Sequence, residues 1–313
     1  MLNTLFGSAL RALLTVFLAV TFTFVMLRIS GDPMTSLLGV ETPPQVIDIL
    51  RQQWGLDRPV TEQYFTYLGR IVTGDFGTSP RSGQDALAMI MEKLPATLRL
   101  MAASLVLALA VGIPLGIVAA HYHGRIVDRT VIGLAVLTHS IPTFLTGILL
   151  IQLFAVQLRI LPSGGGATLA HMVMPALAIG LYNAGVIARF VRSSVLEVIG
   201  QRYILAARAK RVSEWGLIVR HVMPNAALPL LTLFGFLLGG MIGGSAVIEA
   251  VFAWPGVGLL LINSVAARDV AVVQAIVILI TVAMVSANLF VDFLHVMIDP
   301  RLRHSQRSRG RVL

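Results

Sequence analysis

Few side chains in this sequence could do chemistry. The first candidates are the ionisable residues within its apolar stretches. His139 lies deep in such a stretch, whereas Glu249, Asp292 and His295 lie nearer the ends of theirs. If these stretches cross a membrane, ionisable residues inside them are candidates for a substrate or ion path. A proton-coupled carrier would place carboxylates near mid-bilayer, and here they lie toward the ends. His139, in Thr-His-Ser-Ile-Pro at 138–142, either touches a substrate or gate or packs beside a proline kink.

Motifs of common hydrolases and nucleotide-binding proteins are absent. No Gly-Lys dipeptide occurs, which excludes a Walker-type phosphate loop, and no H-E-x-x-H pair could hold zinc. The absence of cysteine excludes disulfides, thiolate metal sites and a cysteine nucleophile. Gly-Gly-Ser-Ala-Val at 243–247 approaches a serine elbow, but Val247 occupies the place of the closing glycine. We therefore expect no catalytic residue, no metal and no bound cofactor, and the small residues at 243–247 suit helix packing.

Composition identifies the elements that must position these residues. Of 313 residues, 56% are hydrophobic and only 12% are charged, and the mean hydropathy is +0.84. Soluble domains have about 25% charged residues. Too little polar surface remains to cover a water-soluble protein, so the sequence indicates an all-α integral membrane protein.

Six stretches are apolar and long enough to cross a bilayer, which needs about 20 residues per helix. They are residues 9–29, 97–120, 131–158, 172–191, 228–250 and 270–297. With the N-terminus inside, the cytoplasmic pieces hold fifteen of the 24 Lys and Arg residues. This asymmetry predicts that both termini are cytoplasmic. The net charge of +9 then reflects topology, and nucleic-acid binding is not expected.

Two long connections divide the chain. The first helix (1–30) is followed by an extracytoplasmic segment, 31–95, which we expect to be a helical lobe on the outer membrane face. Residues 96–298 form a five-helix core that contains a long cytoplasmic connection, 192–228, and residues 299–313 are a basic tail. Because long connections in compact bundles tend to be functional, the 192–228 connection is a candidate site.

The cytoplasmic connection contains a short helix-forming stretch, 201–211, rich in Ala, Leu and Arg. Its alanines leave a smooth surface that another backbone could approach closely, which suits insertion into a partner's groove. A basic helix lying on anionic lipid is the alternative. Composition does not decide between the two.

The stretch 205–224 resembles the EAA loop of permease subunits in binding-protein-dependent ABC importers. That loop reads E-A-A, three residues, G, nine residues, I-x-L-P. Here Leu-Ala-Ala at 205–207 stands for E-A-A, and His-Val-Met-Pro at 221–224 matches I-x-L-P at the right distance. Leu205 replaces the acidic residue, and Arg211 occupies the position of a glycine that normally ends the helix.

Other landmarks resemble one branch of this family, the first permease subunit of dipeptide, oligopeptide, nickel and glutathione importers. In order they are Gly-Asp-Pro at 31–33, Gly-Leu-Asp-Arg-Pro at 55–59, Gly-Asp-Phe-Gly at 74–77, Leu-Pro-Ala-Thr at 94–97, Ser-Ile-Pro at 140–142, Leu-Pro at 161–162, Phe-Ala-Trp-Pro-Gly-Val-Gly at 252–258 and Asp-Pro-Arg at 299–301. The resemblance implies a type I ABC importer permease fold with six transmembrane helices and a periplasmic helical lobe after the first.

The resemblance also implies roles for particular residues. The helix of the EAA loop would dock on a partner ATPase through Tyr203, Ala206, Ala207, Arg208, Ala209, Lys210 and Arg211. A small-residue series, Gly235, Gly239 and Gly243, allows close helix contact and would line the pore, contact a second permease or pack internally. Trp254, Pro255 and Gly256 would form part of a periplasmic gate, with the indole anchored at the membrane interface.

The implied function is movement of short peptides or a similar solute across the bacterial inner membrane by alternating access. The expected partners are a second permease subunit, two ATPase subunits that bind ATP and Mg²⁺, a periplasmic or lipid-anchored solute-binding protein, and membrane lipid. A self-sufficient secondary carrier or channel is the alternative, and an intramembrane hydrolase is disfavoured because no nucleophile or metal set is present. The family shares these landmarks across substrates, so the solute stays open, with peptide preferred to nickel because His139 alone is a poor nickel site.

Overall fold

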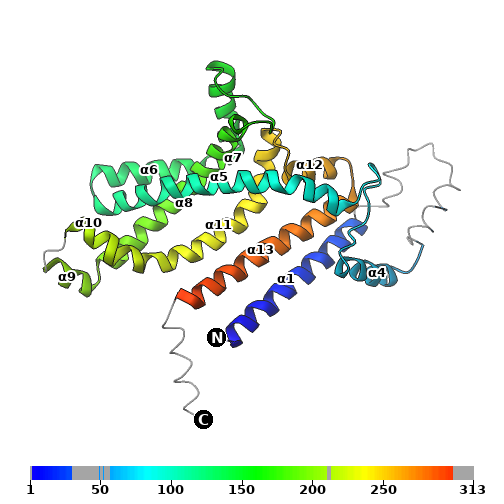
Figure 1. Cartoon of the computed structure of the whole chain (residues 1–313), viewed down its shortest axis with the longest axis horizontal. Helices are drawn as coiled ribbons and strands as arrows, with labels where there is room; N and C mark the ends of the chain where they lie inside the picture. The colour runs from blue at the N-terminus through cyan, green and yellow to red at the C-terminus, as the bar shows by residue number, and fades with distance from the viewer. Residues whose placement is uncertain (1, 30–48, 50–51, 53–56, 210–212, 299–313) are drawn as a thin grey trace, which may run out of the picture.

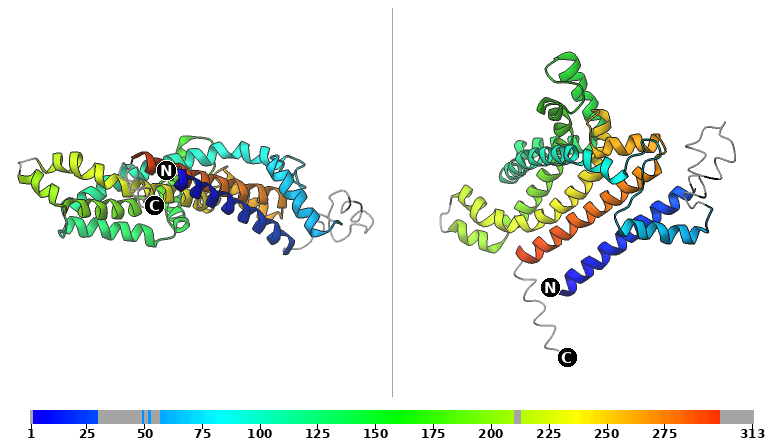
Figure 2. Two further views of the ribbon diagram at one scale, coloured as in Figure 1. Left: turned by 90° about the horizontal axis from the view of Figure 1, so that it is seen from below. Right: turned by 45° about the vertical axis from the view of Figure 1, so that its right-hand side comes forward.

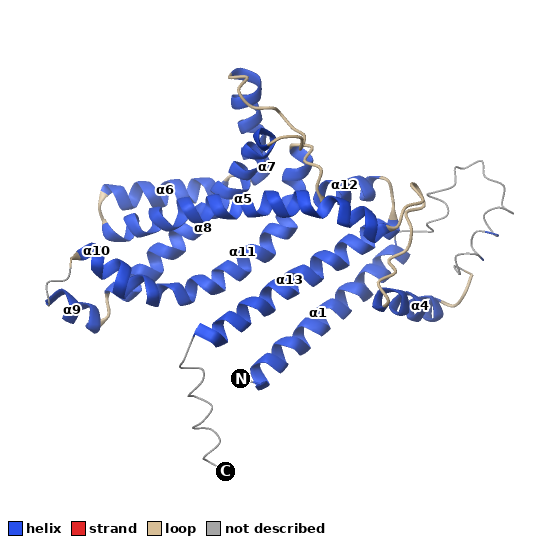
Figure 3. Ribbon diagram, viewed as in Figure 1, coloured by secondary structure: helices blue, strands red, loops and turns tan. Residues whose placement is uncertain are grey.

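Long apolar helices carry the fold. The computed structural model describes residues 2–29, 49, 52, 57–209 and 213–298. Apart from an isolated bridge between Thr78 and Asp85, every regular element in these ranges is helical (Figure 3). The helices are α1 (Leu2–Ile29), α4 (Val60–Val72), α5 (Ala86–His121), α6 (Ile126–Ser140), α7 (Thr143–Leu150), η1 (Ile151–Gln157), α8 (Leu169–Ile199), α9 (Arg202–Ala209), α10 (Glu214–Leu217), η2 (Ile218–Val222), α11 (Met223–Val251), α12 (Val257–Ala266) and α13 (Val270–Ile298).

Four helices in the described ranges are long and apolar enough to cross a membrane, namely α1 over Gly7–Met26, α5, α8 and α13. Two bent pairs, Ile126–Ser140 with Thr143–Gln157 and Leu233–Met241 with Gly243–Val251, raise the number to six if each pair counts as one span. The hydropathy pattern therefore located the four long apolar helices and both bent pairs, but it did not include the shorter apolar helix α12.

The apolar stretch expected as a span over residues 131–158 is not one continuous helix. The chain turns by 97° between α6 and the helix that follows. Ile141 adopts an extended conformation, with ψ 123°, and Pro142 precedes α7 with ψ 138°. Proline lacks an N–H and disfavours the helical conformation of the residue before it, so the helix breaks at this dipeptide.

Helix α5 begins earlier than the boundary expected at residue 95. Asp85 caps its N-terminus by accepting a hydrogen bond from the backbone N–H of Ala88 at 2.8 Å, and Pro95 lies inside the helix. Residues 86–95 thus form the first turns of a 36-residue helix, about 54 Å long. Of the lobe expected over 31–95, the described residues show α4 and the loop that leads into α5.

Helices α5 and α8 form the central pair, and α6 packs beside them (Figure 1). Two glycines of α5 permit the close approach. A Cβ at Gly112 would lie 2.8 Å from the carbonyl oxygen of Ala184, and one at Gly116 would lie 2.6 Å from that of Ala188. Any larger residue would push the two backbones apart, so the sequence fixes a short interhelical distance here.

The molecule has two distinct ends. Helices α9 and α10 lie at one end, whereas α4 and α12 lie at the opposite end (Figures 1 and 2). The start of α1 and the end of α13, which pack against each other, both point toward the side that carries α9 and α10. The short helices α9 and α10 of the 192–228 connection are thus separated from α4 and α12 by the length of the apolar bundle.

Candidate functional site

The helix expected to dock on a partner, α9, lies at one end of the bundle (Figure 1). Tyr203 and Ala209 are exposed, with 46% of the Tyr203 surface accessible, while Ala207 is partly buried and packs inward. Ala206 and Arg208 belong to the backbone of the same helix. Lys210 and Arg211 lie outside the described residues. The exposed face of α9 therefore includes Tyr203 and Ala209 but not Ala207.

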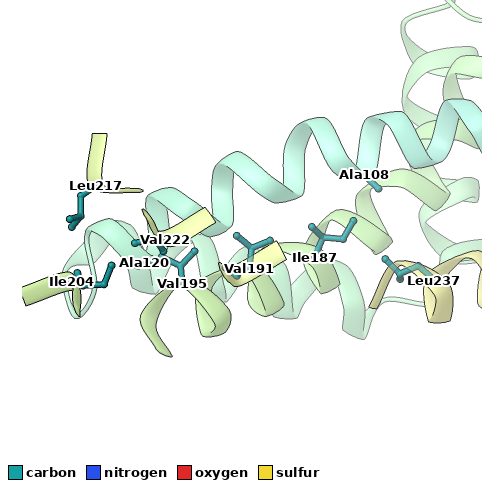
Figure 4. Close-up of a cluster of buried hydrophobic side chains, with 10 residues drawn as sticks. Ala108, Ala120, Ile187, Val191, Val195, Ile204, Leu217, Val222 and Leu237 are labelled. Atoms are coloured by element: carbon teal, nitrogen blue, oxygen red, sulfur yellow. The ribbon is translucent and has the colours of Figure 1, made fainter. Parts of the chain in front are cut away.

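A hydrophobic cluster anchors α9 to the membrane helices (Figure 4). Its buried members come from α5, α8, α9, α10, η2 and α11. They are Ala108, Ala120, Ile187, Val191, Val195, Ile204, Leu217, Val222, Ala226 and Leu237. Ile204 is fully buried and is the contribution of α9 to this cluster. Because close-packed interiors deform little, a displacement of α9 would be passed to α8 and α5.

An ion pair between α6 and α8, which was not predicted from the sequence, lies at the same end of the bundle. The guanidinium of Arg192 on α8 donates two hydrogen bonds to the carboxylate of Asp128 on α6, at 2.6 and 2.8 Å. The backbone N–H of Gly124 donates to the same carboxylate at 2.9 Å, and His123 Nδ1 lies 3.2 Å from it. Asp128 is buried, so this fork-like pair ties the α5–α6 loop to the helix that leads into α9.

At the opposite end, the turn after α11 is built around Glu249. This carboxylate is fully buried and accepts hydrogen bonds from the Thr97 hydroxyl at 2.7 Å and from the backbone N–H groups of Gly258 and Leu259 at 2.7 and 3.1 Å. The Thr97 oxygen accepts in turn from the backbone N–H of Val257 at 2.8 Å. Glu249 and Thr97 together cap the N-terminus of α12, whose first N–H groups have no partner within the helix.

The three residues expected to form a gate lie in this turn, but one expectation about them is corrected. Trp254 is only 5% exposed, and its indole N–H donates to the carbonyl oxygen of Ala96 at 3.0 Å. It is packed inside the chain and does not anchor at a membrane interface. A Cβ at Gly256 would overlap the Glu249 carboxylate and the Thr97 hydroxyl, so only glycine fits there. The turn is thus closely packed against Ala96 and Thr97 of α5.

A glycine loop from another part of the chain covers this turn. The backbone N–H of Gly165 donates to the carbonyl oxygen of Phe252 at 2.8 Å. A Cβ at Gly166 would lie 2.5 Å from the ring of Pro255. The segment that follows η1 thus packs directly on Pro255 and fixes its position.

His139 lies at the C-terminal end of α6, just before the break at Pro142, and its side chain is exposed. Its ring is stacked at 4.7 Å, tilted by 33°, against Tyr182 of α8. Among the described residues no group of three or more His, Asp or Glu side chains could hold a metal ion. His139 is thus an exposed aromatic contact at a bend in the chain.

The glycine series of α11 divides into two environments. A Cβ at Gly235 would lie 2.8 Å from Val291 of α13, and one at Gly239 would lie 3.5 Å from Met284. Gly243 has nothing within 4 Å of its Cβ position. The first two therefore serve packing within this chain, and Gly243 faces open space. Ser245, the serine of the elbow-like stretch 243–247, lies within helix α11 and not at a strand-to-helix turn.

Solved structures share this architecture. The methionine ABC transporter MetNI, in inward-facing conformations, aligns with a TM-score of 0.56 at 21% identity, covering 68% of this chain and 97% of that one. A second crystal form aligns with a TM-score of 0.59, covering 67% and 96%. The all-helical membrane bundle therefore has the permease fold of type I ABC importers, as expected from the sequence.

The sequence comparisons place the chain within a family. Residues 112–304 match the family described as binding-protein-dependent transport system inner membrane component, and residues 1–101 match the N-terminal component of that system. The chain is 39% identical over 305 residues to the glutathione transport system permease protein GsiC of Escherichia coli (strain K12), and equally to GsiC of Salmonella choleraesuis (strain SC-B67). Each match covers 97% of this chain and 100% of the relative. The chain belongs to this family of inner membrane transport permeases, and it is a transport component and not an enzyme.

Proposed function

We propose that this chain is one of two permease subunits of an ATP-driven importer for a short peptide, with glutathione as the first candidate solute. The likeness over the full length to glutathione permeases supports this choice. Glutathione is itself a short peptide, so it falls within the peptide class expected from the sequence. Partner ATPases would supply the energy, and a solute-binding protein would deliver the solute on the other side of the membrane.

The observation that carries the proposal is the construction of α9. This helix presents Tyr203 and Ala209 outward, while Ile204 is embedded in the cluster that spans α5, α8 and η2. A small exposed face on a helix rigidly joined to two membrane helices suits a groove in a partner that pushes and pulls it. The EAA-like residues Ala206, Ala207, Arg208, Lys210 and Arg211 belong to the same docking segment.

The outer turn with Trp254, Pro255 and Gly256 would act as the gate at the opposite end, and the open face at Gly243 would meet the second permease subunit. In this orientation both termini lie in the cytoplasm, on the side of α9. Closure at one end and opening at the other would follow from rocking of the helix bundle around the solute path.

Retention of partner subunits during purification tests the docking role. The chain would be co-expressed with its candidate ATPases and second permease, and Ala209→Trp would be compared with wild type. We expect the bulky side chain to release the ATPases, because it fills the face that the partner must approach. Ala266→Trp, at an exposed position at the other end of the bundle, is the matched control and should retain them. Equal retention by Ala209→Trp and wild type would remove α9 as the docking element.

A further inference from the structure

Helix α4 lies beside the far end of α1 (Figures 1 and 2). Aromatic side chains of the two helices are in contact. The Phe24 ring lies 5.3 Å from the ring of Tyr64, edge to face, and 5.4 Å from that of Tyr67. The hydroxyl groups of Thr21 and Tyr64 share a hydrogen bond of 2.7 Å. These contacts fix α4 at the level of residues 21–24 of α1.

That level lies within the apolar membrane stretch of α1, Gly7–Met26. Thr21 is five residues, or about 7.5 Å along the helix axis, before the end of this stretch. A helix that contacts Thr21 and Phe24 is therefore at the depth of the outermost part of the hydrocarbon region or the headgroups above it. It cannot stand free in the aqueous phase beyond the membrane.

The surface of α4 has three distinct strips. One strip, with Tyr64 and Tyr67, faces α1. A second carries Phe65 and Val72, seven residues apart and hence on one face, with 69% and 87% of their surfaces exposed. A third carries Glu62 and Arg70, and Glu62 pairs with Arg58 at 2.9 Å.

We propose that α4 is an interfacial helix that inserts Phe65 and Val72 into the lipid leaflet on the side of the lobe, with Glu62 and Arg70 directed to the headgroups and water. A helix with adjacent apolar and charged strips lies in the plane of a membrane interface. At the same end of α1, the apolar side chains of Phe22 and Val25 are also exposed, with 62% and 42% of their surfaces accessible.

The environment of Tyr67 agrees with this position. Its hydroxyl is buried and has no hydrogen-bond partner among the described residues. Burial, with a smaller effect from the neighbouring Tyr64, raises the pKa of Tyr67 to about 12. The Tyr67 ring lies 5.4 Å from that of Phe24 on α1, so this side of α4 is enclosed by the protein itself. The inference is independent of the transported solute.

The absence of native cysteine allows a direct test with single labelled sites. Phe65→Cys and Val72→Cys would be compared with Thr66→Cys and Arg70→Cys, each labelled with an environment-sensitive fluorophore. The assembled transporter would be reconstituted in vesicles of phosphatidylethanolamine and phosphatidylglycerol. We expect probes at 65 and 72 to emit at shorter wavelength, to be quenched by brominated lipids and to be protected from aqueous iodide. Probes at 66 and 70 should show the reverse pattern.

Two results would overturn the inference. In one, probes at 65 and 72 are quenched by iodide as strongly as those at 66 and 70, with no quenching by brominated lipid. In the other, they become protected only when the solute-binding protein is added, which would make the strip a protein-docking surface. Because the apolar strip is sampled at two positions and the control comparison at two more, misfolding of one variant leaves the comparison intact.

Discussion

At the scale of single residues, two buried carboxylates hold the two ends of the bundle. Asp128 fixes the α5–α6 loop to α8, and Glu249 holds the turn that begins α12. Both accept backbone N–H groups as well as side-chain donors. Since buried polar groups are costly when left unpaired, each cluster should be sensitive to the loss of one partner.

Thr97→Val tests the outer cluster, because valine has the shape of threonine without its hydroxyl. It leaves the Val257 N–H and one Glu249 oxygen without their partner, and we expect a loss of about 1–3 kcal/mol of stability. Thr97→Ser keeps the hydroxyl and should retain most of that stability. Thermal unfolding of the two purified variants in detergent would measure this difference in stability. Equal unfolding temperatures would show that the Thr97 hydroxyl does not stabilise the turn.

The inner ion pair predicts an asymmetry between its two halves. Arg192→Met leaves the Asp128 carboxylate buried, with 5% of its side chain exposed, and should cost about 3–5 kcal/mol. Asp128→Asn leaves Arg192, whose side chain is 25% exposed and can be hydrated, so it should cost less. The double variant should recover part of the loss. Thermal unfolding of the three variants measures the coupling energy between Asp128 and Arg192, with the exposed Arg129→Gln as control. Losses of stability that are strictly additive would contradict this coupling.

At the scale of elements, the close contact of α5 with α8 depends on glycine. Gly116→Ala would bring a Cβ to 2.6 Å from a backbone oxygen of α8, and we expect a loss of about 1–3 kcal/mol from the forced separation. Gly133→Ala on α6 meets nothing within 4 Å and should be neutral or stabilise by about 0.5–1 kcal/mol. Opposite shifts in unfolding temperature support this contact, whereas equal shifts would argue against it.

The positions of helices could be predicted from the sequence where hydropathy alone determines that a segment is a membrane-spanning helix. The apolar stretches form α1, α5, α8, α11 and α13. In a bilayer, a single stretch of about 20 apolar residues can pair its own backbone N–H and C=O groups only by folding into a helix. A kink at Pro142 was one of the alternatives considered for His139, but its size of 97° was not predicted, because hydropathy does not report backbone geometry. The early start of α5 was missed because Pro95 was taken as a boundary, although the cap at Asp85 begins the helix.

Within the candidate site, sequence could supply residue types but not their partners. Asp128 and Arg192 are separated by 64 positions, and Thr97 and Glu249 by 152. Trp254 was expected at the membrane interface because tryptophan is common there, but its hydrogen bond to Ala96 spans 158 positions. Such pairs follow from tertiary packing, which local patterns do not encode.

At the scale of the whole molecule, the geometry connects the two ends. The cluster around Ile204 joins α9 to α8 and α5, and α5 reaches the outer turn, where Thr97 meets Glu249. A movement imposed on α9 therefore has a continuous packed route through α5 to the turn with Trp254. In the proposed alternating-access mechanism, the 36-residue helix α5 would carry this movement from one end to the other.

Solute uptake by the assembled transporter tests the central claim most directly. The chain, its candidate second permease and ATPases would be reconstituted in vesicles, with ATP on the side of α9 and binding protein loaded with labelled glutathione on the other. We predict uptake that requires both ATP and the binding protein and that is lost with Ala209→Trp. Uptake by this chain alone, without ATP, would contradict the account and would identify a self-sufficient carrier.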